Sequence, residues 1–169
     1  MYDIIAQVIG ILGTCAAILA FQCKKNTHMF LAQALSGLLF TVNFIMLGAY
    51  GGGLLNFVNV IRGVALVYIP DKHRKLVCLG SILLYGLVTV ITYEGYMSII
   101  ILVAQIVGTI TMMINSGKII RLTHLCVVGP LWMYHNYACG SIGGVLCEVF
   151  NITSIIVSII RHGINGFSK

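Results

Sequence analysis

Long apolar runs follow one another through almost the whole chain, and only short polar or glycine-rich segments separate them. Of the 169 residues, 59% are hydrophobic and 8% are charged, which is too little charge to cover the surface of a soluble domain. A helix of about 20 apolar residues crosses the hydrocarbon core of a bilayer. The sequence therefore predicts an all-α membrane protein, a single transmembrane domain over 1–169, with seven transmembrane helices at 4–22, 29–50, 53–69, 76–93, 96–115, 118–138 and 142–160.

Nine of the ten basic residues lie on one side of this seven-helix arrangement, after the first, third, fifth and seventh runs. The other side holds Asp3, Glu94 and two glycine turns, at 48–53 and 140–144. The positive-inside rule makes the basic side cytoplasmic, which places the N-terminus outside and the C-terminus inside. The basic residues are thus expected to be topology signals in a lipid bilayer, and nucleic acid is not an expected partner.

Two registers of internal similarity divide the chain into halves. Gln7-Val-Ile-Gly10 resembles Gln105-Ile-Val-Gly108, and Gly48-Ala-Tyr-Gly-Gly52 resembles Gly140-Ser-Ile-Gly-Gly144. The second register pairs Phe40 with Trp132, Asn43 with His135, Asn56 with Glu148, and Asn59 with Asn151. An odd number of helices per repeat makes the repeats parallel when one helix links them. We therefore expect a 3+1+3 arrangement, with repeats over about 4–69 and 96–161 and a linker helix over about 76–93.

Polar side chains inside the apolar runs are costly in lipid, so their positions are informative. Asn56, Asn59 and Arg62 recur on one face of the third helix, and Glu148 and Asn151 recur on one face of the seventh. Because these helices are equivalent in the two repeats, the two faces are expected to meet near the midplane. The predicted substrate-binding residues are Asn59, Asn151, Trp132, Phe40, Asn43, His135 and Asn136, and the predicted coupling or gating residues are Glu148 and Arg62.

For several of these residues a structural role competes with a functional one. Ligand binding is favoured for Asn59 and Asn151, whereas hydrogen bonding between helices is an equal or better interpretation for Asn43 and Asn136. His135 is interpreted as a structural histidine before a titrating one. For the two charged residues, one hypothesis is a structural ion pair. The other makes Glu148 a proton or cation site and Arg62 a gate.

The chain also resembles a known group of proteins. The 3+1+3 layout is similar to that of the SWEET, PQ-loop and PnuC superfamily of small-solute transporters. Within that superfamily it most resembles the YgjV-type bacterial inner-membrane proteins, on the basis of 47–50, 59–62, 132–136, 140–144 and Glu148. The resemblance implies a transporter fold in the bacterial inner membrane and no particular substrate.

By analogy with SWEET proteins, a solute would lie between Asn59 and Asn151, with Phe40 and Trp132 as the aromatic residues. Two features of those relatives are absent here. The PQ dipeptide is missing, and Pro130 is the only proline within the predicted helices, so their proline-hinge mechanism is not implied.

Three functions remain open at this point. The first is a facilitator or proton-coupled transporter of a small polar metabolite, working by alternating access. The second is an ion or proton channel, and the third is a receptor or scaffold that transports nothing. An enzyme is not expected, because no nucleophile–base pair and no metal-ligand spacing is found, so no metal or other cofactor is expected either. The chain could form a homo-oligomer.

Overall fold

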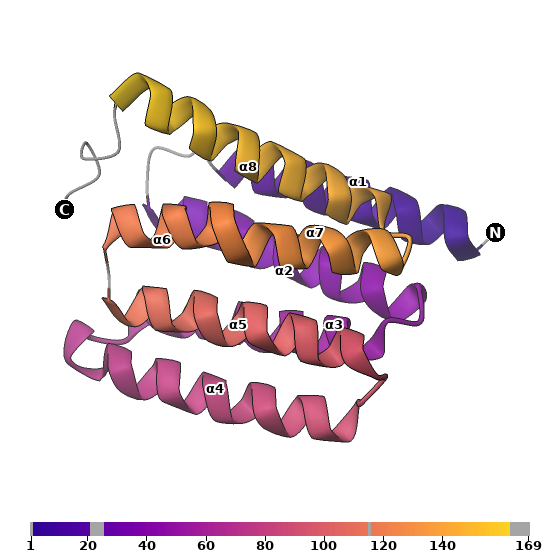
Figure 1. Ribbon diagram of the computed structural model, residues 1–169, viewed down its shortest axis with the longest axis horizontal. Helices are drawn as coiled ribbons and strands as arrows, with labels where there is room; N and C mark the ends of the chain where they lie inside the picture. Colours follow the sequence, from indigo (N-terminus) through magenta and orange to yellow (C-terminus); the bar gives the residue numbers. More distant parts are fainter. Residues whose placement is uncertain (1, 21–25, 115, 163–169) are drawn as a thin grey trace.

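The computed structural model describes residues 2–20, 26–114 and 116–162, which form helices joined by short turns (Figure 1). The helices are α1 (Tyr2–Ala20), α2 (Asn26–Met46), α3 (Tyr50–Tyr68), α4 (Arg74–Ile91), α5 (Tyr96–Ile114), α6 (Gly117–Thr123), α7 (Gly129–Ala138) and α8 (Ile142–His162). A 3-10 turn, η1 (Asp71–His73), precedes α4, and a π-helical turn, η2 (His124–Val128), joins α6 to α7 without a break. With α6, η2 and α7 taken as one, the described residues form seven helical segments, which confirms the all-α prediction.

Four helices of the described residues are long and apolar enough to cross a membrane: α3, α4, α5, and α8 over Ile142–Arg161. Shorter apolar stretches occur in α1, over Asp3–Leu19, and in α2, over Leu31–Met46. The sixth predicted span is divided by the π turn into two short helices. That the segments 4–22, 29–50 and 118–138 also cross the membrane therefore remains a prediction.

The helices lie roughly along one common direction (Figure 1). Their packing contacts join α1, α2, α3, α5, α7 and α8 into a ring. α1 packs against α2 and α8, and α2 packs against α3. α3 in turn contacts α4 and α5, and α7 contacts both α5 and α8. The two halves of the chain therefore meet at two helix pairs, α1 with α8 and α3 with α5.

The turns after α2 and α7 are tighter than the glycine pattern predicted. Gly48 and Gly140 adopt φ of 79° and 72°, a left-handed conformation that glycine reaches without steric cost. The glycines that follow them lie inside α3 and α8 rather than in the turns. They serve close packing instead, since a Cβ on Gly143 would lie 2.2 Å from the carbonyl carbon of Gly10.

The α7–α8 turn is fastened to the first half of the chain by side chains of α1 and α2. Gln7 Nε2 donates to the carbonyl of Gly140 at 2.6 Å, and the amide of Ile142 donates to Gln7 Oε1 at 3.0 Å. Thr14 Oγ1 donates to the carbonyl of Gly143 at 2.7 Å. Because these bonds satisfy backbone groups at a helix start, they fix one end of the interface between the halves.

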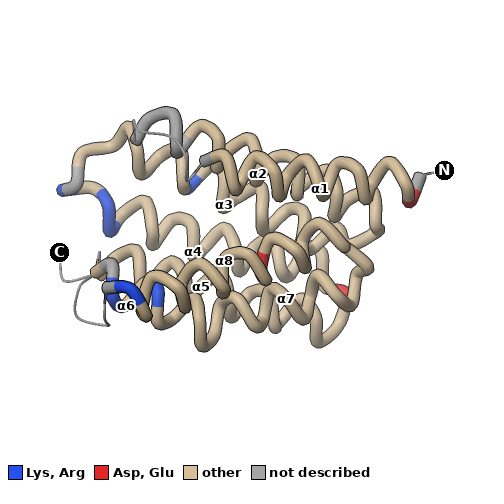
Figure 2. The backbone as a smooth tube through the Cα atoms, turned by 90° about the horizontal axis from the view of Figure 1, so that it is seen from above, with Lys and Arg blue, Asp and Glu red and all other residues tan. Residues whose placement is uncertain are grey.

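The surface of the bundle is apolar, as a lipid environment requires. Leu83, Val90 and Ile160 are each more than three-quarters exposed, at 76%, 78% and 77%. Lysine and arginine lie mostly toward the end of the bundle near the C-terminus, away from the N-terminus (Figure 2). The described basic residues therefore gather mostly at one end of the helix axes.

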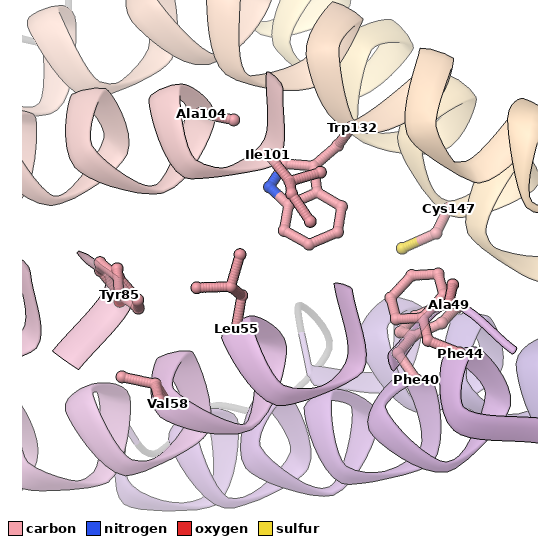
Figure 3. Packing of buried hydrophobic residues seen from close by; sticks show 10 residues of the cluster. All are labelled: Phe40, Phe44, Ala49, Leu55, Val58, Tyr85, Ile101, Ala104, Trp132 and Cys147. Carbon is pink, nitrogen blue, oxygen red and sulfur yellow. The ribbon is translucent and has the colours of Figure 1, made fainter. Parts of the chain in front are cut away.

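The apolar core lies between the two halves (Figure 3). Phe40, Phe44 and Leu55 from the first half point toward Trp132 and Cys147 from the second. Of the described cysteines, Cys78 and Cys147 are buried and Cys15 and Cys126 are exposed.

Candidate functional site: a polar cavity between the halves

A cavity of about 320 Å³ lies between the two halves of the bundle. Small-molecule sites have volumes of about this size or larger. α1, α2, α3, α5, α8 and the α6–η2–α7 segment all contribute to its lining, whereas α4 does not. Seven of the nine residues predicted for the site line it: Phe40, Asn59, Arg62, Trp132, Asn136, Glu148 and Asn151.

The cavity extends from the middle of the bundle toward its basic end. Ala17, Met112 and Ile120 line it, and each lies close to the end of its helix that adjoins a basic segment. At the other end, Phe44 and Asn136 belong to the lining and are 2% and 3% exposed. The cavity therefore reaches further toward the basic end than toward the glycine turns.

Aromatic rings close the cavity on the side of the glycine turns. Phe44 stacks on Phe40 with ring centroids 6.1 Å apart and on Trp132 with centroids 5.9 Å apart. His135 packs edge-on against Phe44 and Trp132, at 5.3 and 5.5 Å. Phe44 was not predicted, although its i, i+4 spacing from Phe40 places both rings on one face of α2. Because Phe44 lies between them, Phe40 and Trp132 do not face each other across an open space.

The asparagine pair lines the same cavity from equivalent helices. The hydroxyl of Tyr85, on α4, donates to Asn59 Oδ1 at 2.9 Å and leaves the amide nitrogen of Asn59 as the group that is free to donate. Within the described part of the chain, Asn151 Nδ2 makes only a long contact of 3.8 Å to Cys147 Sγ. Both amides therefore keep hydrogen-bonding capacity on the cavity side.

Arg62 is 7% exposed and lines the cavity from α3. Its Nη1 donates to Thr109 Oγ1 on α5, and its buried Nε has no hydrogen-bond partner among the described residues. No carboxylate that the structure describes pairs with it. The structural ion pair with Glu148, one of the two hypotheses from the sequence, is therefore not formed.

Glu148 has a different partner, which the sequence did not suggest. Its Oε2 lies 3.1 Å from Nε2 of His124, and both side chains line the cavity. In the chain, His124 follows Lys118 and Arg121 of the basic segment. It reaches the cavity from the first position of the π turn, where the amide of Gly129 bonds to the carbonyl of His124 instead of the usual i−4 acceptor.

The π turn has a local cause in the sequence. Pro130 lies two residues after the turn and has no N–H with which to continue the hydrogen-bond ladder of an α-helix. A wider turn accommodates that loss, and π turns often occur at functional sites. Pro130 thus marked the position of this irregularity, although its consequence for His124 could not be read from the sequence.

Two of the predicted residues, Asn43 and His135, do not line the cavity. Asn43 is fully buried, donates to the carbonyl of Ala6 at 2.7 Å and accepts from Ser141 Oγ at 2.6 Å. These bonds tie α2 to α1 and to the α7–α8 turn, which is the structural interpretation. His135 lies behind the aromatic rings and packs against Gly52. A Cβ added to Gly52 would lie 2.5 Å from the imidazole ring of His135.

One further cavity residue emerges from the structure. Gln105 is 3% exposed, lines the cavity from α5, and its Nε2 has no hydrogen-bond partner among the described residues. Its counterpart Gln7 spends both amide groups on the α7–α8 turn. Similarity between these two positions was visible in the sequence, but their different bonding was not.

Comparison with known proteins assigns the chain to a family. Residues 4–165 match the model of the Imp-YgjV family, which is described as a bacterial inner membrane protein. No curated protein and no solved structure matches the chain.

Proposed function

We propose, from the premise that the chain belongs to the Imp-YgjV family of bacterial inner membrane proteins, that it is a transporter of a small polar metabolite. The transporter crosses the inner membrane with seven helices, N-terminus outside, and works by alternating access around the cavity between its halves. It acts either as a facilitator or with coupled protons.

One observation carries this proposal: a cavity lies between the halves, and its lining includes amides with unused hydrogen-bonding groups. Gln105 Nε2 and Asn136 Oδ1 belong to lining residues, are buried, and have no hydrogen-bond partner among the residues that the structure describes. An unpaired buried polar atom costs free energy, and more so in a membrane, where water is scarce. A polar solute that binds there would supply the missing partners.

The local structure of the two glycine turns supports the internal repeat. Each turn has a positive-φ glycine and the same set of four backbone hydrogen bonds at equivalent positions. In the first turn the bonds run from Leu47 to Asn43, Gly48 to Ile45, Ala49 to Phe44 and Gly53 to Ala49, and in the second from Cys139 to His135, Gly140 to Tyr137, Ser141 to Asn136 and Val145 to Ser141. This equivalence supports the register inferred from the sequence.

Helix packing supports a pseudo-two-fold relation between the repeats. A rotation that exchanges α1 with α5 and α3 with α8 turns the α1–α8 contact into the α5–α3 contact, and both contacts occur. α4 stands outside this exchange and serves as the linker. In parallel repeats of this kind the solute site lies at the repeat interface near the midplane. The position of the cavity between the two halves supports this assignment.

Access to the cavity is expected to alternate between its two ends. In the present conformation the cavity extends toward the basic end, which we assign to the cytoplasm, and the rings of Phe40, Phe44 and Trp132 close the other end. Opening to the outside would separate Phe44 from Trp132, because these rings come from different repeats.

Flux measurements in proteoliposomes test the transporter proposal. Purified protein would be reconstituted and screened for uptake of radiolabelled small polar solutes, with protein-free vesicles and heat-inactivated protein as controls. Saturable uptake of at least one solute is expected. Ion current without saturable solute uptake would instead identify a channel.

The Glu148–His124 pair favours proton coupling as the driving mechanism. A carboxylate and an imidazole 3.1 Å apart in a membrane cavity can share or exchange a proton. An inward proton gradient should then accelerate uptake, and a protonophore should abolish the acceleration. Equal uptake rates with and without the proton gradient would identify the protein as a facilitator without proton coupling.

A further inference from the structure

The wall of the cavity formed by α3 and α5 carries a cluster of hydrogen-bond donors. Arg62 Nε and Gln105 Nε2 are both buried donors without partners among the described residues. The amide nitrogen of Asn59 is the third donor, because its carbonyl oxygen accepts from Tyr85. All three residues line the cavity.

These donors lie close together. Asn59 and Arg62 are one turn apart on α3, and Gln105 and Thr109 are one turn apart on α5, so each pair shares a helix face. The bond from Arg62 to Thr109 Oγ1 joins the two faces. Gln105 therefore stands on the same stripe as the residue that holds the guanidinium.

Two acceptors next to these donors are already occupied. Thr109 Oγ1 accepts a hydrogen bond from Arg62, and Asn59 Oδ1 accepts a hydrogen bond from the hydroxyl of Tyr85. Since no described carboxylate pairs with Arg62, a positive charge remains in the cavity next to two neutral donors. An anion with several acceptor atoms would satisfy all three groups at once.

The shape of the free guanidinium edge indicates which anion fits. Nη1 is engaged by Thr109, whereas Nε, on the other edge, is not. That edge carries two parallel N–H groups and matches the two oxygens of a planar carboxylate. The aromatic rings of Phe40 and Trp132 in the same lining offer an apolar surface for the rest of the solute.

We propose that Arg62, Gln105 and Asn59 form a subsite for the carboxylate group of the transported solute, so that the substrate is a small organic acid. This inference rests on the proposed transport function for its physiological meaning. The subsite itself is a binding property and is tested without transport.

The test compares matched carboxylates and carboxamides on the purified full-length protein in detergent. Benzoate against benzamide and acetate against acetamide differ in charge at nearly constant shape. Calorimetric titration and thermal unfolding at millimolar concentrations would measure binding, with inorganic phosphate as a second anion. At least one carboxylate should bind about tenfold or more tightly than its carboxamide, because it makes charge-assisted hydrogen bonds.

Two substitutions at Gln105 locate the binding to this wall. Gln105→Glu places a carboxylate of the protein beside Arg62, so it should raise the thermal stability of the free protein and reduce carboxylate binding by about tenfold or more. Gln105→Leu removes one donor without adding charge, and should weaken carboxylates less than Gln105→Glu does. Neither substitution should change the weak binding of benzamide by as large a factor as the change in carboxylate binding. Because these variants leave Arg62 in place, they avoid the folding risk of removing a buried charge.

The possible outcomes separate this inference from the transport proposal. Carboxylate binding that Gln105→Glu abolishes, without flux in proteoliposomes, supports the subsite and contradicts the transporter. Flux of neutral solutes, with no preference for carboxylates, supports the transporter and contradicts the subsite. Binding of phosphate but of no carboxylate, binding of neither, or carboxylate binding unchanged in Gln105→Glu would each overturn the subsite.

Discussion

Asparagines inside the bundle divide into two groups according to their hydrogen bonds. Asn43 uses its amide on Ala6 and Ser141, and Asn56 uses its amide on the carbonyl of Gly37 at 2.8 Å. Asn59 and Asn151 instead retain unused groups on the cavity lining. The same residue type therefore serves helix packing in one group and is available to a solute in the other.

This division predicts different effects of alanine substitution. Asn151→Ala should leave the melting temperature nearly unchanged and reduce uptake, since a solute group loses a partner worth about 1–3 kcal/mol. Asn59→Ala should also reduce uptake, but it removes the acceptor of the buried Tyr85 hydroxyl and should therefore lower the melting temperature as well. Asn43→Ala is the matched control, and should lower the free energy of unfolding by about 1–3 kcal/mol because Ser141 Oγ and the Ala6 carbonyl lose a buried partner. Uptake that survives in both cavity variants would remove Asn59 and Asn151 from the solute site.

A second residue-scale prediction concerns Glu148. Glu148→Gln keeps a side chain that can hydrogen-bond His124 but cannot release a proton, so protein stability should hold while uptake loses its dependence on a proton gradient. The measurement is uptake with and without an imposed gradient, alongside thermal unfolding. A loss of stability with gradient dependence intact would show that the carboxylate only holds His124 in place.

At the scale of elements, the sequence was most informative where a pattern extends over a whole helix. Apolar runs located the helices to within a few residues, and the face shared by Asn59 and Arg62 was sufficient to bring both residues into one cavity. Partners across helices were harder to predict. Glu148 binds His124 and not Arg62, because the π turn before Pro130 changes the register of its helix, and a periodicity argument assumes regular turns.

Glycines inside helices are another feature whose role only the structure reveals. Gly143 was expected in a turn, but it lies in α8 against the backbone of α1, and Gly144 lies against Asn136. Helices in membranes approach closely at small residues, and such contacts depend on the neighbouring helix rather than on local sequence. Close packing between the two halves therefore depends partly on glycines, which have no side chain to keep the helices apart.

Gly143→Ala tests that contact. The added Cβ would lie 2.2 Å from the Gly10 carbonyl carbon, so α1 and α8 must separate, and the expected loss of stability is about 1–3 kcal/mol. Gly86→Ala on α4 is the control, because its Cβ meets nothing within 4 Å and alanine favours a helix. Thermal unfolding in detergent measures both, and equal melting temperatures would contradict close α1–α8 packing.

At the scale of the whole molecule, charge and topology make one joint prediction. Tags at the N-terminus and within 47–49 should be accessible from the outside of intact cells, whereas tags within 71–73 and at the C-terminus should be accessible only after permeabilisation. The reason is the basic end of the bundle, which the positive-inside rule keeps in the cytoplasm (Figure 2). A C-terminus labelled from outside would invalidate both the orientation and the count of seven spans.

Alternating access around the cavity is the central claim, and Cys147 is a native reporter for it. This cysteine lines the cavity and is 8% exposed. In a variant that keeps Cys147 and replaces Cys15, Cys23, Cys78, Cys126 and Cys139, a charged thiol reagent that cannot cross the membrane would be applied separately to each side of oriented vesicles. Alternating access predicts modification of Cys147 from both sides, faster from the cytoplasmic side, toward which the cavity now extends. Modification from one side alone, or from neither, would contradict it.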